Sequence, residues 1–208
     1  FSTVKHKVYS LSFGALWNFS SHHFAGLSVT RAQRAPAIEE LFANGPHVAS
    51  GTFEEGDPNL REETSNNIDL SLRKSTGPWR WTANIFVNFI EDFVFQESQD
   101  IDGNGFADEV DVDRVLGGEL LLIAFRQQDA LFYGIEAESR YEIFDNDKGK
   151  LGLRIWGDWI RAKLDKGGNL PRIPPARLGT NLEYNHRQWH LDADLTYTFK
   201  QSRVSTLE

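Results

Sequence analysis

Residues 9–19 read YSLSFGALWNF, and this stretch decides the class of fold. Every odd position from Tyr9 to Phe19 is apolar, whereas the even positions between them are mostly small or polar. Successive side chains of a β-strand point to opposite faces, so a period of two gives one apolar and one polar face. The stretch therefore predicts a strand with one face against an apolar medium and the other against water.

The same alternation continues along the chain. Residues 131–143 and 189–199 also place apolar side chains at odd positions. Turn residues separate such runs, and together they predict eight strands. These are about 8–20, 24–34, 63–74, 79–98, 117–143, 150–164, 177–186 and 189–202. The fifth strand is longer than a membrane-spanning strand needs to be, so we expect its first half to project beyond the membrane.

The lengths of the connections carry more information than the strands. Residues 20–23, 75–78, 144–149 and 185–188 are short turns, whereas 35–62, 99–116 and 165–176 are long, and the two kinds alternate. This alternation is typical of outer-membrane barrels, which have tight periplasmic turns and long outer loops. Aromatic side chains near the strand ends fit an interfacial girdle, namely Trp79, Trp81, Trp156, Trp159, Tyr184 and Trp189.

Composition limits the alternatives. A formal net charge of −8 argues against a nucleic-acid partner, which normally meets a basic face. The chain has no cysteine, and no apolar run approaches the roughly 20 residues of a spanning helix. A soluble sandwich or lipocalin-like barrel also alternates, but its hairpins are not sorted into short and long. We therefore predict an all-β, antiparallel transmembrane β-barrel segment, with outer-membrane lipid against its apolar face.

The stretch between the second and third strands is specific. It contains Arg-Ala-Pro, then Glu-Leu-Phe, and after a loop Gly-Asp-Pro-Asn-Leu and a glutamate. This pattern resembles the barrel signature of the TonB-dependent outer-membrane receptors. The matching positions are Arg34, Ala35, Pro36, Glu40, Leu41, Phe42, Gly56, Asp57, Pro58, Asn59, Leu60 and Glu63. DALFYGIEAES (129–139) and LPRIPPARLG (170–179) resemble two later strands of that family, in the same order.

The resemblance implies a larger protein. It implies a 22-stranded barrel in the outer membrane of a Gram-negative cell, with an N-terminal plug domain and coupling to the TonB energy-transducing complex. On that basis residues 1–208 are expected to be part of the barrel only, about eight strands, without the plug and the remaining strands. ANGPH (43–47), SGTFEEGD (50–57) and LPRIPPAR (170–177) resemble the zinc-uptake (ZnuD-like) branch. Haem and siderophore receptors share the scaffold and remain alternatives.

The long loop 35–62 contains a possible zinc site. His47 lies in a Gly-Pro-His turn, and Glu54, Glu55 and Asp57 follow within ten residues. Imidazole and carboxylate groups are suitable zinc ligands, and a zinc site needs about four of them. A solvated loop histidine near ordinary loop carboxylates is the alternative interpretation. We predict zinc as a transported ligand and no required cofactor.

A second loop, DIDGNGFADEVD (100–111), has the ligand spacing of a calcium loop. The positions that match the twelve-residue pattern are Asp100, Asp102, Asn104, Phe106 through its carbonyl, Asp108 and Asp111. Asp111 replaces the usual bidentate glutamate and reaches less far, so weaker binding is expected. The alternative is an acidic loop built on Asp-Gly and Asn-Gly turns. We predict a possible structural calcium that orders this loop.

Catalytic motifs are weak. Gly-x-Ser-x-Gly is absent, and the two Ser-x-x-Lys matches at Ser2/Lys5 and Ser71/Lys74 lack their partner motifs. We predict that the protein is not an enzyme. An outer-membrane barrel hydrolase is the alternative of another class, and an adhesive or structural barrel is a third. Charged residues on the polar face, such as Arg154, Asp158, Asp192, Asp194 and Lys200, are expected to form the inner wall of the barrel.

Overall fold

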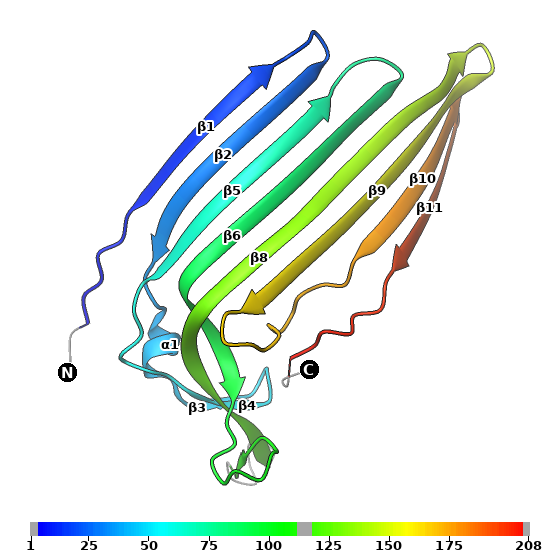
Figure 1. The fold of residues 1–208 in the computed structure, drawn as a ribbon. Helices are drawn as coiled ribbons and strands as arrows, with labels where there is room; N and C mark the ends of the chain where they lie inside the picture. The colour runs from blue at the N-terminus through cyan, green and yellow to red at the C-terminus, as the bar shows by residue number, and fades with distance from the viewer. Residues whose placement is uncertain (1–3, 112–117, 206–208) are drawn as a thin grey trace.

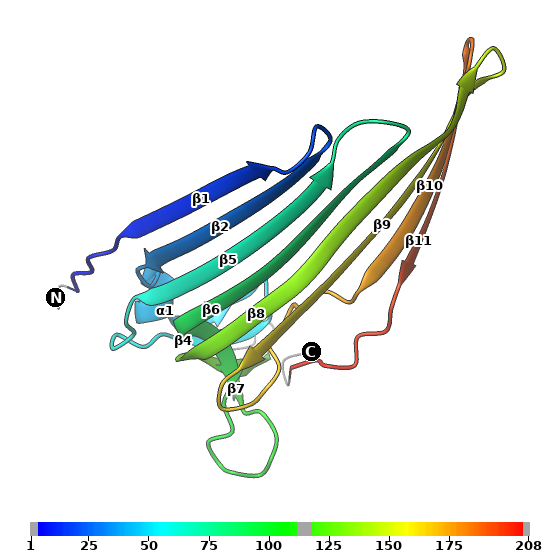
Figure 2. The same cartoon turned by 45° about the horizontal axis from the view of Figure 1, so that its top comes forward.

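A computed structural model describes residues 4–111 and 118–205 of the chain. One curved antiparallel sheet runs through these residues, with its long strands in the order in which they occur in the sequence (Figures 1 and 2). The long strands are β1 (Ser10–Asn18), β2 (His23–Arg34), β5 (Glu63–Lys74), β6 (Trp79–Ser98), β8 (Glu119–Asn146), β9 (Gly149–Leu164), β10 (Arg177–His186) and β11 (Trp189–Thr198). The prediction of eight strands joined by alternating short and long connections is confirmed, with boundaries shifted by a few residues.

Four short elements lie in the long connections. Helix α1 (Ile38–Phe42), β3 (Asn44–His47) and β4 (Thr52–Glu55) belong to the connection between β2 and β5, and β7 (Glu109–Asp111) precedes β8. The β3–β4 hairpin was not predicted. β4 also pairs in parallel with residues 121–124 of β8, far from it in sequence.

The register sorts the side chains into two faces. Residues directly opposite each other on adjacent strands share a face. One apolar row contains Phe13, Val29, Ile68, Val87 and Tyr133, and the next contains Ala15, Leu27, Leu70, Ile85, Ile135 and Trp159. The opposite face carries Ser71, Asn84, Glu136, Asp158 and Arg177 in one row. Many of the apolar side chains are exposed, including Phe13 at 67% and Ile68 at 52%, as a lipid-facing surface requires.

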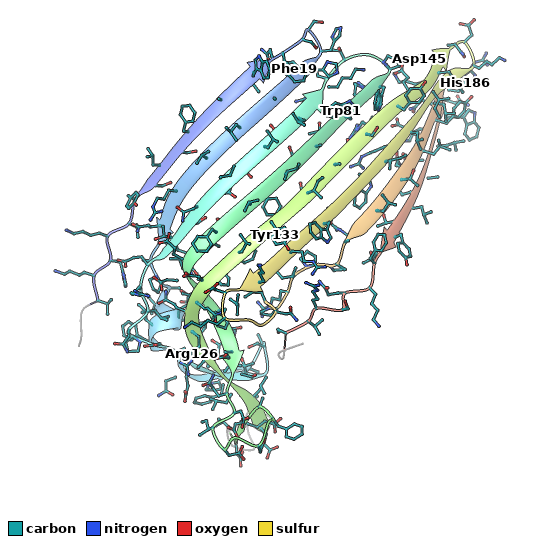
Figure 3. The ribbon with its side chains drawn as sticks, in the orientation of Figure 1. Phe19, Trp81, Arg126, Tyr133, Asp145 and His186 are labelled. Atoms are coloured by element: carbon teal, nitrogen blue, oxygen red, sulfur yellow. The ribbon has the colours of Figure 1, made fainter. Side chains whose placement is uncertain are left out.

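Aromatic side chains gather near both ends of the apolar face. At the short-turn end, Phe19 stacks on His23, and His23 lies near Trp81; Figure 3 shows Phe19 and Trp81 at this end. Towards the other end, Tyr133 and Trp159 meet edge to face with ring centroids 5.6 Å apart. Two belts of this kind are typical of the two membrane interfaces. Among the described residues, no helix is long and apolar enough to span a membrane.

The hairpin of β6 and β8 continues past its neighbours at the long-loop end. β9 ends where Leu164 pairs with Ala130, and β5 begins opposite Glu91, so residues 119–129 of β8 extend beyond both strands. A β-bulge between Ile90 and Phe93, with Asp92 at φ 55°, bends β6 at the point where the extension starts. The first half of this strand therefore extends beyond its neighbours, as a projection beyond the membrane would require, and the bulge bends the hairpin there.

Candidate functional site

The connection between β2 and β5 is fastened to the sheet by Arg34. Its Nε donates to Glu63 Oε2 at 2.6 Å, and its Nη1 donates to Glu40 Oε2 at 2.9 Å. Glu63 Oε1 also accepts from the backbone N–H of Val94 at 2.6 Å. Arg34 and its two carboxylate partners thus join β2, α1, β5 and β6.

The Gly-Asp-Pro part of the signature closes the same connection. Gly56 donates its N–H to Ala43 O at 2.8 Å, and Asp57 donates its N–H to Glu40 O at 2.9 Å. A Cβ at Gly56 would lie 2.6 Å from the backbone of Leu41 and Phe42. Glycine is needed here because the chain passes directly against the end of α1. Asp57 Oδ1 accepts from the backbone N–H of Asn59 at 2.8 Å and holds the next turn.

A small core lies beneath α1. Leu41, Leu60, Val94 and Phe125 are all buried and pack on one another. They come from the helix, the following turn and the extended β6–β8 hairpin. Leu41 and Leu60, two of the positions that match the family signature, therefore lie in a packed core at the start and end of this connection.

The β3–β4 hairpin follows α1 and carries three of the four predicted zinc ligands, His47, Glu54 and Glu55. Nδ1 of His47 lies 2.8 Å from Glu54 Oε1 across the hairpin. The Glu54 side chain is 11% exposed, whereas that of His47 is 57% exposed. Gln96 Nε2 also approaches Glu54 Oε1, at 3.4 Å. The Glu54 carboxylate is therefore held on one side by Gln96 of β6, and the His47 ring that it contacts is open to solvent.

The other two predicted zinc ligands are not brought to this pair. Glu55 follows Glu54 in β4, so its side chain points to the opposite face of the strand, where it is exposed. Asp57 is engaged in the turn with Asn59. Within residues 4–111 and 118–205, one group of three or more His, Asp or Glu side chains has ligand atoms within 4.8 Å of one another, and it is Asp100, Asp102 and Asp108.

That acidic group is the predicted calcium loop. Its carboxylates accept from the loop's own backbone: Asn104 N–H donates to Asp100 and Asp102, each at 3.0 Å, and Gly105 N–H donates to Asp100 at 2.9 Å. Phe106 is exposed, and Asp111 lies in β7 opposite Glu119, outside the group of three. The structure thus gathers three of the four predicted aspartate ligands, and the Asn104 amide donates to Asp102 at 2.8 Å.

Sequence reasoning missed an apolar pocket beside this connection. It has a volume of about 280 Å³ and is lined mainly by Phe93, Phe95, Phe125, Phe132, Leu170 and Ile173, with Glu40 at its edge. Phe93 and Phe132 meet edge to face at 5.4 Å. A signal was present, since Phe132 occupies a polar-face position in the alternation of residues 131–143. The sequence did not show that Phe132 lines a pocket, because the β6 bulge after Ile90 and loop 165–176 bring the other lining residues to it.

The polar face of the sheet carries many charged side chains, as predicted. Two of its ion pairs join neighbouring strands and not residues of the same strand. Arg154 pairs with Glu138 at 2.6 Å, and Asp158 pairs with Arg177 at 2.9 Å. Trp156 lies between the two arginines, whose guanidinium carbons are 6.0 and 5.7 Å from its ring centroid. Asp192 accepts from Asn181 on the neighbouring strand. Lys200 lies beyond the end of β11.

Comparison with known proteins agrees with this architecture. Residues 1–206 match the family model described as TonB dependent receptor-like, beta-barrel. The chain therefore belongs to the TonB-dependent receptor β-barrel family, a family of outer-membrane barrels. This supports the receptor interpretation over the barrel hydrolase and the adhesive barrel.

Solved structures show the same fold. The chain is similar to the copper transporter OprC, with a TM-score of 0.74 and 16% identity, over 95% of this chain and 27% of that one. It is also similar to the ferric enterobactin receptor PfeA of Pseudomonas aeruginosa, solved as a Q482A mutant with enterobactin, with a TM-score of 0.63 and 17% identity, over 90% and 27%. For the FrpB iron transporter of Neisseria meningitidis the values are 0.56 and 13%, over 89% and 25%. The chain thus spans about a quarter of these proteins' length.

Proposed function

We propose that this barrel segment belongs to a receptor that imports a metal ion, zinc by preference, across the outer membrane of a Gram-negative cell. Family membership supports the receptor class, the outer-membrane location and the TonB complex as energy source. The observation that carries the metal is the His47–Glu54 pair on the β3–β4 hairpin, at the long-loop end of the wall. In this proposal the outer loops and the plug capture the ion, and energised movement of the plug releases it inwards.

The geometry assigns different roles to the two residues. A carboxylate that accepts from Nδ1–H of a histidine fixes the ring and its tautomer, and leaves Nε2 as the metal ligand. Glu54 fits that orienting role because its side chain is nearly buried, whereas His47 is open to an incoming ion. One histidine is too few for a zinc site. The other ligands are proposed to come from parts of the receptor outside these 208 residues.

The test is zinc binding to the full-length receptor, measured by calorimetry in calcium-containing buffer. We expect His47→Ala to weaken binding by at least about tenfold, or about 1.4 kcal/mol. Glu54→Gln is expected to weaken it less, because the ligand atom remains and only its orientation is lost.

Glu55→Gln is the matched control, since Glu55 lies next to Glu54 in β4 but on the other face and is expected to leave zinc binding unchanged. Unchanged tight binding by His47→Ala would move the zinc site away from this hairpin. Absence of zinc binding by the wild type would contradict the zinc proposal and leave the receptor class standing.

A metal chelate, such as haem or a siderophore, is the second candidate. The aromatic pocket of about 280 Å³ favours it, because organic ligands are held mainly by apolar and aromatic walls with a few polar groups. One of the similar structures is a ferric enterobactin receptor solved with enterobactin. If this candidate holds, Phe132→Ala weakens chelate binding to the full-length receptor, whereas His47→Ala does not.

A further inference from the structure

Three arginines lie in one row on the polar face of the sheet, each directly opposite the next. Arg80 of β6 is directly opposite Arg140 of β8, and Arg140 is directly opposite Arg154 of β9. Side chains in directly opposite positions have Cβ atoms about 5 Å apart, and like charges placed there are destabilising. A row of three guanidinium groups is thus an unfavourable arrangement unless negative charge meets it.

The wall supplies only part of that charge. Glu138 pairs with Arg140 at 2.5 Å and with Arg154 at 2.6 Å, so a single carboxylate serves two of the three arginines. Arg73 lies opposite Thr82 on the same face, close to this row. Across the described parts of the chain, no carboxylate lies within ion-pair distance of Arg73 or Arg80. Two cations therefore remain uncompensated, although the chain as a whole carries a formal charge of −8.

An open cavity lies against these groups. It has a volume of about 320 Å³, and Arg73, Arg80 and Arg140 line it, with Glu138 as the one acid among its lining residues. The cavity is next to the short turn between β5 and β6, at the opposite end of the wall from His47. It is separate from the proposed metal site.

We propose that Arg73, Arg80 and Arg140 form an oxyanion site that takes a carboxylate group. The planar guanidinium fork matches a carboxylate with two parallel hydrogen bonds, and several forks converge on this cavity. The carboxylate comes either from a soluble anion inside the barrel or from an acidic side chain of the polypeptide that fills the barrel. Both sources meet the same chemistry, and they respond differently to added anion.

The test uses thermal unfolding of the full-length receptor, wild type against Arg80→Gln and Arg73→Gln, with and without citrate at constant ionic strength. These two arginines have no carboxylate partner in the described residues, whereas Arg140 pairs with Glu138. Lys148→Gln, in an exposed short turn at the same end, is the matched control. The direction of the shift is informative. Without a bound carboxylate, removal of an arginine that has no carboxylate partner and lies near other cations raises the melting temperature or leaves it unchanged. With one bound, the same change removes its partner and lowers the melting temperature, because a bound anion stabilises the folded state.

Each outcome bears on the proposal. If citrate raises the melting temperature of the wild type but not of Arg80→Gln, the site takes a soluble carboxylate. If citrate does not change the melting temperature of the wild type, and both arginine variants melt at a lower temperature than Lys148→Gln, the carboxylate belongs to the polypeptide inside the barrel. If both variants melt at or above the wild type and citrate has no effect, the proposal is wrong. None of these results depends on zinc binding.

Discussion

At the scale of single residues, the family signature is explained by contacts rather than by ligand chemistry. Arg34 binds two carboxylates from separate elements, Glu40 and Glu63. Gly56 allows the chain to pass against α1, and Leu41 and Leu60 fill the small core. These contacts fasten the connection between β2 and β5 to the sheet, and the same connection carries His47 and Glu54.

Gly56→Ala tests the close passage of the chain against α1. The added methyl group meets backbone atoms at 2.6 Å, and backbone does not move aside as a flexible side chain does. We expect a loss of about 1–3 kcal/mol, the usual cost of overpacking, and easier proteolysis of residues 35–62 in the full-length receptor. Gly45→Ala is the control, because its Cβ meets nothing within 4 Å. Equal stability and protease resistance of the two variants would contradict the contact.

Two aromatic rings on the polar face lie over glycines. A Cβ at Gly179 would lie 2.2 Å from the ring of Trp156, and one at Gly134 would lie 2.7 Å from the ring of Phe86. Trp156 is also the ring between Arg154 and Arg177.

Gly179→Val is expected to displace Trp156, so that its indole becomes more accessible to a collisional quencher of fluorescence. Gly152→Val is the control on the neighbouring strand, because nothing lies within 4 Å of its added Cβ. A quenching curve for Gly179→Val that matches the control would show that the ring does not depend on this glycine.

At the scale of elements, the long strands follow from their local pattern, whereas the loops contain structure of their own. The connection between β2 and β5 builds a helix and a hairpin, and β4 adds to β8 beyond the end of β9. The extended hairpin of β6 and β8 is the support for that addition.

The acidic loop 100–111 remains a predicted calcium site. If calcium orders it, EDTA makes this loop more sensitive to protease in the full-length receptor, because three carboxylates within 4.8 Å then repel one another. The β3–β4 hairpin is the internal control and is expected to keep its resistance. Asp102→Asn is expected to give the same sensitivity without EDTA. Protease sensitivity that EDTA leaves unchanged would count against calcium.

At the scale of the whole molecule, the described residues form an open wall. Within residues 4–111 and 118–205, β1 pairs only with β2, and β11 pairs only with β10, so each has one free edge. Unpaired strand edges are not tolerated in the hydrocarbon core of a bilayer, where backbone groups find no water.

We therefore predict that residues 1–208 alone do not form a closed monomeric barrel in lipid vesicles. Closed outer-membrane barrels resist unfolding by detergent until heated, and the full-length receptor is expected to show this shift on a gel. The isolated segment is expected to lack it and to aggregate through its edges. A heat-dependent shift of the segment at monomer size would contradict the prediction.

Local patterns along the chain were sufficient to predict the long strands, their two faces and the alternation of short and long connections. These features depend on period-two patterns and turn residues that act within a few positions of one another, so a linear pattern contains them. The family motif could be recognised for the same reason, and His47 could be identified as a candidate ligand.

The contacts between side chains, in contrast, could be seen only in the folded chain. The pairing of His47 with Glu54, the passage of Gly56 against α1, and the row of Arg80, Arg140 and Arg154 each depend on loop path or strand register. A shift of register by one residue moves every side chain of a strand to the other face. Register and loop path are fixed by contacts between segments, so the sequence could name His47, Glu54 and Gly56 as candidates but could not show what each of them contacts.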